Sequence, residues 1–104
     1  MYKRQTPSNG YLALKNLKAY GGHCITLTDE EILSAQKDLS SSCGLFSEPA
    51  AAAAYAGFSK QKQKLDSNST CVVLLTGNGL KDINSASKYI LKPQKTINSL
   101  DELY

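Results

Sequence analysis

The segment VVLLTGNGLKD, residues 72–82, carries an apolar run that stops on a threonine and a Gly-Asn-Gly turn. An apolar run without polar alternation is typical of a parallel strand that is covered on both faces. We therefore predict a buried strand over residues 70–75. Such a strand needs neighbouring strands at its edges and helices over its faces, so it limits the fold more than any other segment does.

A helix and a second strand are predicted near the start of the chain. Residues 11–20 have an apolar face at helical spacing, and Gly21-Gly22 ends this helix, as glycine just past a helix commonly does. Residues 23–27 follow as a short strand.

The next helix is predicted to begin at a capping box. The Thr28 hydroxyl and the Glu31 carboxylate can each accept a hydrogen bond from the otherwise unpaired backbone N–H of the other residue. Apolar residues then repeat along one face at Ile32, Ala35 and Leu39. We expect this helix to run to about residue 42, with Gly44 closing it.

A third helix is predicted to begin with Pro49 in the first helical position, which proline prefers. Its alanines let neighbouring segments approach closely, so we expect a central, buried helix. Its lysine-rich tail, with Lys60, Lys62 and Lys64, is more simply a solvated face than a phosphate-binding stripe. A weak helix is expected near residues 84–90.

Strands that alternate with helices favour an α/β fold with a parallel sheet. Only two strands are predicted, which is few for a self-sufficient α/β domain, so we expect the chain to be the end of something larger. We divide it into a leading segment 1–5, an α/β part 6–90 and a tail 91–104 that packs on the surface. The leading MYKRQ resembles a translated adapter remnant, so we do not expect it to be native sequence.

The small net positive charge of the chain does not indicate a function. The net charge is +3, but MYKRQ holds two of the twelve basic residues, and ten basic residues then stand against nine acidic ones. We expect no nucleic-acid partner. No apolar run approaches the roughly 18 residues that a membrane span needs, so no membrane partner is expected either.

The three cysteines and the single histidine lack metal-ligand spacing, and we expect no metal site. Cys71 opens the apolar strand and is interpreted as a small buried residue. His23 is interpreted as a solvated residue at a strand edge. Widely spaced cysteines without a pairing pattern favour the reducing cytoplasm.

Thr76 stands at the carboxyl end of the predicted strand, where ligands collect in open parallel sheets. The glycines of the turn that follows, Gly77 and Gly79, allow a neighbour or a ligand to approach the backbone closely. The alternative is a tight turn that Thr76 merely caps. The turn is not a phosphate loop, because both common phosphate-loop patterns are missing.

Three segments together resemble the carboxyl-terminal part of the threonine synthase family. They are TDEEI at residues 28–32, EPAAAAAYAG at residues 48–57, and VVLLTGNGLKD. This family belongs to the fold type II pyridoxal-phosphate enzymes, the tryptophan synthase β-subunit superfamily, and the resemblance covers the chain from about residue 6. Threonine dehydratase and cysteate synthase are related alternatives, although the LKD that follows TGNG favours the synthase.

The resemblance implies that Thr76, Gly77, Asn78 and Glu48 bind the cofactor, pyridoxal 5'-phosphate. Thr76 matches the family position whose hydroxyl hydrogen bonds to the pyridine nitrogen, and such a donor leaves the ring neutral. Gly77 matches the turn that holds this hydroxyl. Asn78 stands where many relatives carry histidine, so it is interpreted as site-lining only. Glu48 matches the glutamate of the EPA motif, with stabilisation of its own helix as the alternative role.

The resemblance further implies a lyase that converts O-phosphohomoserine and water to threonine and phosphate. Residues 6–90 would be part of the large domain, and the complete enzyme would be a cytoplasmic homodimer. The family's Schiff-base lysine, its asparagine loop and its glycine-rich phosphate loop match nothing in this chain. We therefore expect the chain to be catalytically inactive alone. A free-standing interaction module is the alternative from a different functional class.

Overall fold

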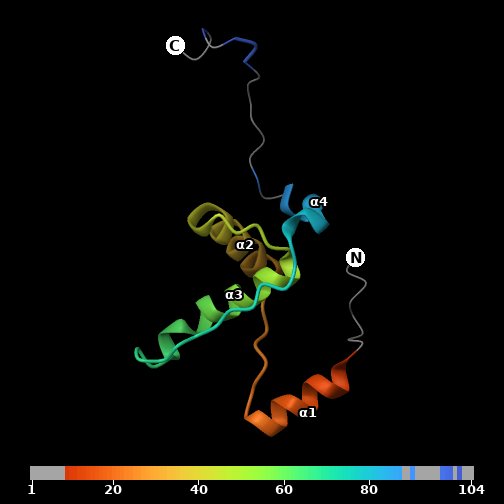
Figure 1. The fold of residues 1–104 in the computed structure, drawn as a ribbon, viewed down its shortest axis with the longest axis vertical. Helices are drawn as coiled ribbons and strands as arrows, with labels where there is room; N and C mark the ends of the chain where they lie inside the picture. Colours follow the sequence, from red (N-terminus) through yellow and green to blue (C-terminus); the bar gives the residue numbers. More distant parts are fainter. Residues whose placement is uncertain (1–8, 88–89, 91–96, 100, 102–104) are drawn as a thin grey trace.

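The computed structural model describes residues 9–87, 90, 97–99 and 101, and within these ranges the chain is helical (Figure 1). The elements are α1 (Gly10–Tyr20), α2 (Asp29–Cys43), α3 (Pro49–Gln61), η1 (Lys62–Lys64), η2 (Gly79–Asp82) and α4 (Ile83–Ser87). The β-pairing found in the described ranges is one isolated antiparallel bridge, between Ser47 and Asn78.

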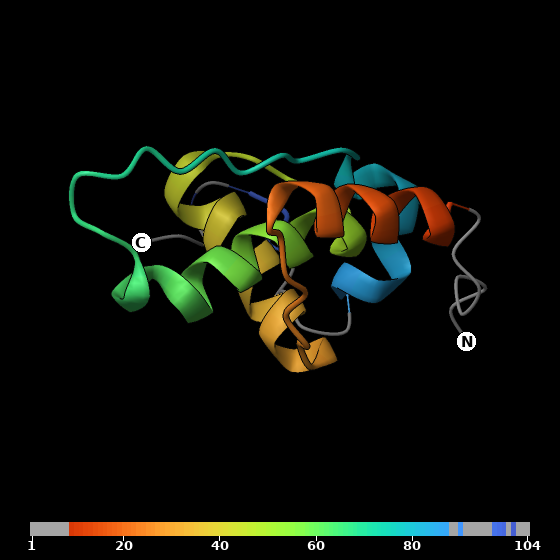
Figure 2. The same ribbon diagram turned by 90° about the horizontal axis from the view of Figure 1, so that it is seen from below.

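The core of the described chain lies between α2 and α3, which pack against each other (Figures 1 and 2). Ala35 and Leu39 of α2 are buried, as are Ala51, Ala52 and Ala56 of α3. Because alanine side chains are short, the two helices can approach closely. The alanine-rich helix was expected to be buried as a whole, but only one face of it is buried, and Ala50 and Ala54 are exposed. The buried set is small for a domain of this length.

The helix ends follow local sequence signals, as predicted. The Thr28 N–H donates to Glu31 Oε2 at 2.8 Å and the Glu31 N–H donates to Thr28 Oγ1 at 3.2 Å, which completes the capping box of α2. Gly21 and Gly44 end α1 and α2 with positive φ angles of 67° and 68°. Pro49 occupies the first turn of α3. Each of these residues satisfies or ends the backbone hydrogen bonding of its own helix terminus, so its effect does not depend on distant parts of the chain.

Helix α1 lies away from the α2–α3 pair, at the end of an extended segment (Figure 1). None of its residues is buried, and Tyr11 and Tyr20 are 84% and 86% exposed. Its apolar face therefore has no covering partner among the described residues.

The two predicted strands, residues 23–27 and 70–75, are extended but join no sheet in the described part of the chain. Val72 and Leu74 are 77% and 72% exposed, and Cys71 is exposed where we expected it to be buried. The predicted parallel strands of the α/β fold are thus not formed here. A strand is stable when its backbone groups pair with a neighbour and its apolar side chains are covered, and these residues have neither.

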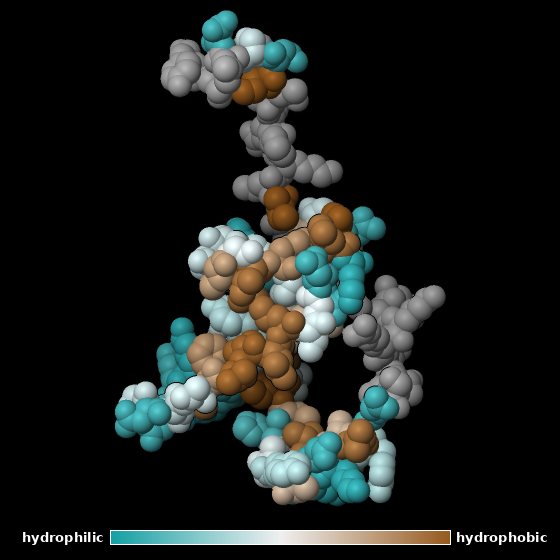
Figure 3. All heavy atoms as spheres, in the orientation of Figure 1, coloured by the Kyte–Doolittle hydropathy of each residue, from teal (hydrophilic) through white to brown (hydrophobic). Residues whose placement is uncertain are grey.

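Both extended segments nevertheless lie over α3. Apolar side chains gather along the path of residues 70–75 on the face shown in Figure 3. An apolar hollow of about 510 Å³ is lined there by Ile25, Leu27, Val72, Leu74 and residues of α3 that include Ala53 and Phe58.

Two further expectations concern the carboxyl end. Helix α4 confirms a helix near residue 84, although it spans only Ile83–Ser87. The leading segment 1–5 and most of the tail 91–104 lie outside the described residues. In the ranges described, no helix has both the length and the apolar character needed to cross a bilayer.

Candidate functional site

The residues expected to form a site lie in two segments that the fold brings side by side. The Glu48 N–H donates to the Gly77 carbonyl at 2.9 Å, and the Gly79 N–H donates to the Phe46 carbonyl at 2.9 Å. Between these bonds, Ser47 and Asn78 form the antiparallel bridge. The link before α3, residues 44–48, and the turn before η2, residues 76–78, therefore form one short paired unit. All four candidate residues lie in these two segments.

The glycines of the turn are required by this close pairing. A Cβ atom on Gly77 would overlap the Glu48 carboxylate and its Cγ atom. A Cβ atom on Gly79 would lie 2.6 Å from three ring atoms of Phe46, which is too close for any real contact. Neither glycine has a positive φ angle, so their role is space and not backbone conformation. The predicted close approach of a neighbour is confirmed at both positions.

Asn78, and not Thr76, caps the turn. The Asn78 Oδ1 atom accepts a hydrogen bond of 2.9 Å from the Leu80 N–H at the start of η2. The interpretation of Thr76 as a mere turn cap is therefore wrong. Thr76 is exposed, and its hydroxyl has no hydrogen-bond partner within the described ranges.

Thr76 faces an open hollow of about 410 Å³ beside this paired unit. Its lining residues are Gly44, Leu45, Phe46, Ser47, Leu75, Thr76, Gly77 and Asn78. This volume lies within the range of about 300–1,000 Å³ that is common for small-molecule sites. The two paired segments form its walls.

The residues around this hollow fit one edge of pyridoxal phosphate. The Thr76 hydroxyl is exposed beside the hollow and can donate a hydrogen bond to a ring nitrogen. The lining includes no basic side chain, so it offers no cation to balance the charge of a phosphate group. The residues of this hollow could therefore hold the nitrogen edge of the ring.

Glu48 is placed by the first turn of α3, where it is the N-cap residue. Its side chain makes no capping hydrogen bond; its backbone carbonyl accepts from the N–H groups of Ala51 and Ala52 at 3.0 and 2.9 Å. The carboxylate lies instead against Gly77. The alternative role, stabilisation of its own helix, is therefore limited to its charge near the helix N-terminus.

Sequence reasoning missed two buried polar residues beside the site. The Gln36 Nε2 atom donates to the Ser47 carbonyl at 2.6 Å, and these residues are 3% and 2% exposed. The signal was present in the sequence, because Gln36 is a polar residue within the apolar stripe of α2, one position after Ala35 and three before Leu39. The Ser47 hydroxyl is buried and has no partner in the described part of the chain.

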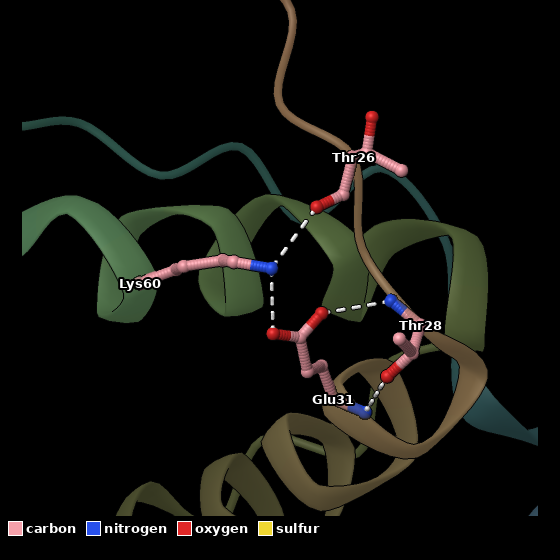
Figure 4. Close-up of polar contacts among 4 residues, drawn as sticks. All are labelled: Thr26, Thr28, Glu31 and Lys60. Carbon is pink, nitrogen blue, oxygen red and sulfur yellow. Dashed lines mark hydrogen bonds and ion pairs between the residues drawn. The ribbon is translucent and has the colours of Figure 1, made fainter.

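A separate cluster ties the helices together away from the hollow (Figure 4). The Lys60 Nζ atom lies 2.7 Å from Glu31 Oε1 and donates to the Thr26 carbonyl at 3.1 Å. The hydrogen bond from Lys60 lowers the pKa of Glu31, and the Thr28 N–H acts in the same direction. Lys60 thus holds α3 to α2, and is not simply a solvated lysine.

A second polar contact joins the same two helices. The Tyr55 hydroxyl donates to Asp38 Oδ2 at 2.7 Å, and the Ser42 hydroxyl donates to Asp38 Oδ1 at 2.9 Å. These bonds lower the pKa of Asp38, and the bond to Asp38 raises the pKa of Tyr55. Both polar contacts are accounted for by helix packing.

Comparison with known proteins relates this chain to a family. The family model described as pyridoxal-phosphate dependent enzyme matches residues 2–77. The threonine synthase of Synechocystis sp. is 42% identical over 80 residues, which is 77% of this chain and 21% of the relative. The threonine synthase of Methanocaldococcus jannaschii is 38% identical over 91 residues, 86% of this chain and 22% of the relative.

A bacterial relative gives the same result. The threonine synthase of Halalkalibacterium halodurans is 41% identical over 86 residues, which is 81% of this chain and 24% of the relative. The chain spans between a fifth and a quarter of the length of these curated relatives.

Proposed function

Because the chain belongs to the pyridoxal-phosphate dependent enzyme family, we propose that it is the carboxyl-terminal part of a threonine synthase. One observation carries this proposal: the segment that ends at Glu48 pairs with the distant turn Thr76-Gly77-Asn78, beside an open hollow. The names of the relatives support the synthase over other activities of the family.

The proposed reaction of the complete enzyme converts O-phosphohomoserine and water to threonine and phosphate. Its proposed setting is a cytoplasmic homodimer, with residues 6–90 in the cofactor-binding α/β domain and residues 91–104 as a surface tail. The chain alone is proposed to be inactive, since the family's Schiff-base lysine and glycine-rich phosphate loop match nothing in its sequence.

In this proposal the Thr76 hydroxyl donates a hydrogen bond to the pyridine nitrogen of pyridoxal phosphate. A neutral hydroxyl does not protonate this nitrogen, whereas a carboxylic acid at the same place would. When bound, the cofactor supplies an electron sink, and a neutral ring suits elimination and replacement at the β and γ carbons. Asn78 holds the turn that presents Thr76, and the Glu48 carboxylate lies against Gly77 of the same turn.

The proposal also accounts for the two extended segments. In the complete enzyme, residues 23–27 and 70–75 are proposed to be strands of a parallel sheet whose other strands come from the rest of the polypeptide. The exposure of Val72 and Leu74 and the apolar hollow over α3 support this (Figure 3). Unpaired strand edges and uncovered apolar side chains both favour the addition of neighbouring strands.

A chimeric enzyme tests the function. In this chimera, residues 6–104 replace the corresponding region of the Synechocystis threonine synthase. Purified chimera with pyridoxal phosphate is expected to release phosphate and form threonine from O-phosphohomoserine. A folded chimera that instead deaminates threonine would indicate a dehydratase, and a folded chimera that binds the cofactor without either activity would contradict the proposal.

A further inference from the structure

We infer that Gln36 is a positioning residue of the proposed cofactor site. From α2 it holds the segment that carries Glu48 in register with the turn that carries Thr76. The inference rests on the proposed function, because it assigns a role within that same site.

The geometry links Gln36 to the site through backbone contacts. Its Nε2 atom donates to the Ser47 carbonyl at 2.6 Å in a buried environment. Ser47 in turn pairs with Asn78, and the adjacent Glu48 N–H donates to the Gly77 carbonyl at 2.9 Å. A shift of the Ser47 carbonyl therefore moves both segments of the paired unit.

The link is bonded to α2 at two places, once through the backbone and once through the Gln36 side chain. At the beginning of the link, the Leu45 N–H donates to the Leu39 carbonyl at 3.1 Å, which continues the helix end of α2. At the end of the link, Gln36 is the α2 side chain that hydrogen bonds to it within the described ranges. The link is thus held to α2 at both ends, and near Glu48 the hydrogen bond to α2 comes from the Gln36 amide.

Packing alone does not explain a glutamine at this place. Position 36 lies in the apolar stripe of α2, next to Ala35 and one turn before Leu39, and it is 3% exposed. A buried side chain that only fills space is normally apolar, while a buried amide is kept where it satisfies a buried group. Here that group is the Ser47 carbonyl.

The chimera described above provides the test, with Gln36→Leu compared with Gln63→Leu. Gln63 is exposed in η1 and lies outside the site, so it is a matched control. The measurements are kcat and KM for O-phosphohomoserine, the absorbance spectrum of the bound cofactor, and the Tm. Small displacements at a reacting centre can lower a rate by about a hundredfold.

We expect Gln36→Leu to lower kcat by roughly ten- to a hundredfold and to shift the cofactor spectrum, with the loss persisting at saturating substrate. Gln63→Leu is expected to leave kcat, KM and spectrum unchanged. A folded Gln36→Leu chimera with unchanged kcat and spectrum would overturn the inference.

A second variant covers the case in which Gln36→Leu does not fold. Gln36→Met has nearly the same length and a flexible side chain, and it carries the same expectation for kcat and spectrum. If neither variant folds, Gln36 serves stability and the inference is wrong. If the unsubstituted chimera is inactive, it is the proposed function that fails, and this result is separate from any effect of Gln36.

Discussion

At the scale of single residues, the proposed site relies on the Thr76 hydroxyl and on the lack of a side chain at Gly77 and Gly79. Thr76 is exposed beside the hollow, and no hydrogen bond within the described ranges engages its hydroxyl. Gly77 and Gly79 have no Cβ atom, and this lets Glu48 and Phe46 lie against the turn. The hydroxyl can be removed by a valine substitution at Thr76, and the missing Cβ atom can be restored by an alanine substitution at Gly77.

Replacing Thr76 by valine in the chimera removes the hydroxyl and keeps the shape of the side chain. A hydrogen bond of about 0.5–1.5 kcal/mol is lost, so kcat/KM is expected to fall by about two- to tenfold. Thr70→Val is the control, because Thr70 is exposed at the far end of the same segment. Equal turnover by the two variants would contradict the role of Thr76.

Gly77→Ala is expected to destabilise the chimera by about 1–3 kcal/mol, because the added Cβ atom must displace Glu48 or the turn. Gly57→Ala provides the comparison, since its Cβ atom would meet only Ile25 Cδ1 at 3.8 Å. In the middle of α3 that change is expected to be neutral or to stabilise by about 0.5–1 kcal/mol. Thermal unfolding of both variants measures the difference, and equal Tm values would contradict the close pairing.

At the scale of elements, α2 and α3 form the packed core of the described chain. Their contact combines short buried side chains with two polar contacts, Lys60 to Glu31 and Tyr55 to Asp38. Surface ion pairs contribute little each, so the alanine packing supplies most of the stability and the polar contacts set the relative position of the helices.

The lowered pKa of Glu31 makes this helix pair sensitive to acid. Its folded pKa lies below the ordinary value of 4.5, so the carboxylate stabilises the fold above that pH and loses its contribution as the pH falls through the folded pKa. We expect helicity of the 104-residue chain, measured by circular dichroism, to decrease below about pH 4.5. In Glu31→Gln the amide retains the capping box but not the charge.

This variant is expected to lose less helicity on acidification than the unsubstituted chain. Asp38 also has a lowered pKa, and it titrates in both proteins, so the difference between them reports on Glu31 alone. Identical acid transitions would show that the contact with Lys60 contributes nothing.

At the scale of the whole molecule, the described chain leaves apolar surface uncovered. Leu74 is 72% exposed and lies with Val72 and Ile25 over α3. In the complete enzyme this surface is proposed to be covered by neighbouring strands, and when it is uncovered it favours self-association.

Leu74→Ser is therefore expected to have opposite effects in two settings. In the 104-residue chain it should reduce self-association, measured by light scattering. In the chimera it should lower the stability by about 2–5 kcal/mol, because there the side chain is proposed to be buried. Lys81→Ser, at an exposed polar position, is the control for both measurements. A Leu74→Ser chimera of unchanged Tm would contradict burial between strands.

The sequence by itself determined the helix ends and the identity of the candidate residues. The residues at the helix ends act on backbone groups within about one turn, so their effect does not depend on distant parts of the chain. They are Gly21, Thr28, Glu31, Gly44 and Pro49. The candidate residues followed from motifs that can be read in order along the chain.

Only the tertiary structure decided how those residues meet. Three contacts join segments that are distant in sequence. Glu48 pairs with Gly77, the Phe46 ring lies against Gly79, and Gln36 donates a hydrogen bond to the Ser47 carbonyl. The two predicted strands do not form among the described residues, because a strand also depends on contacts with segments that are distant in sequence. A helix satisfies its own backbone, whereas a strand over residues 70–75 requires a neighbour, and none is present among the described residues.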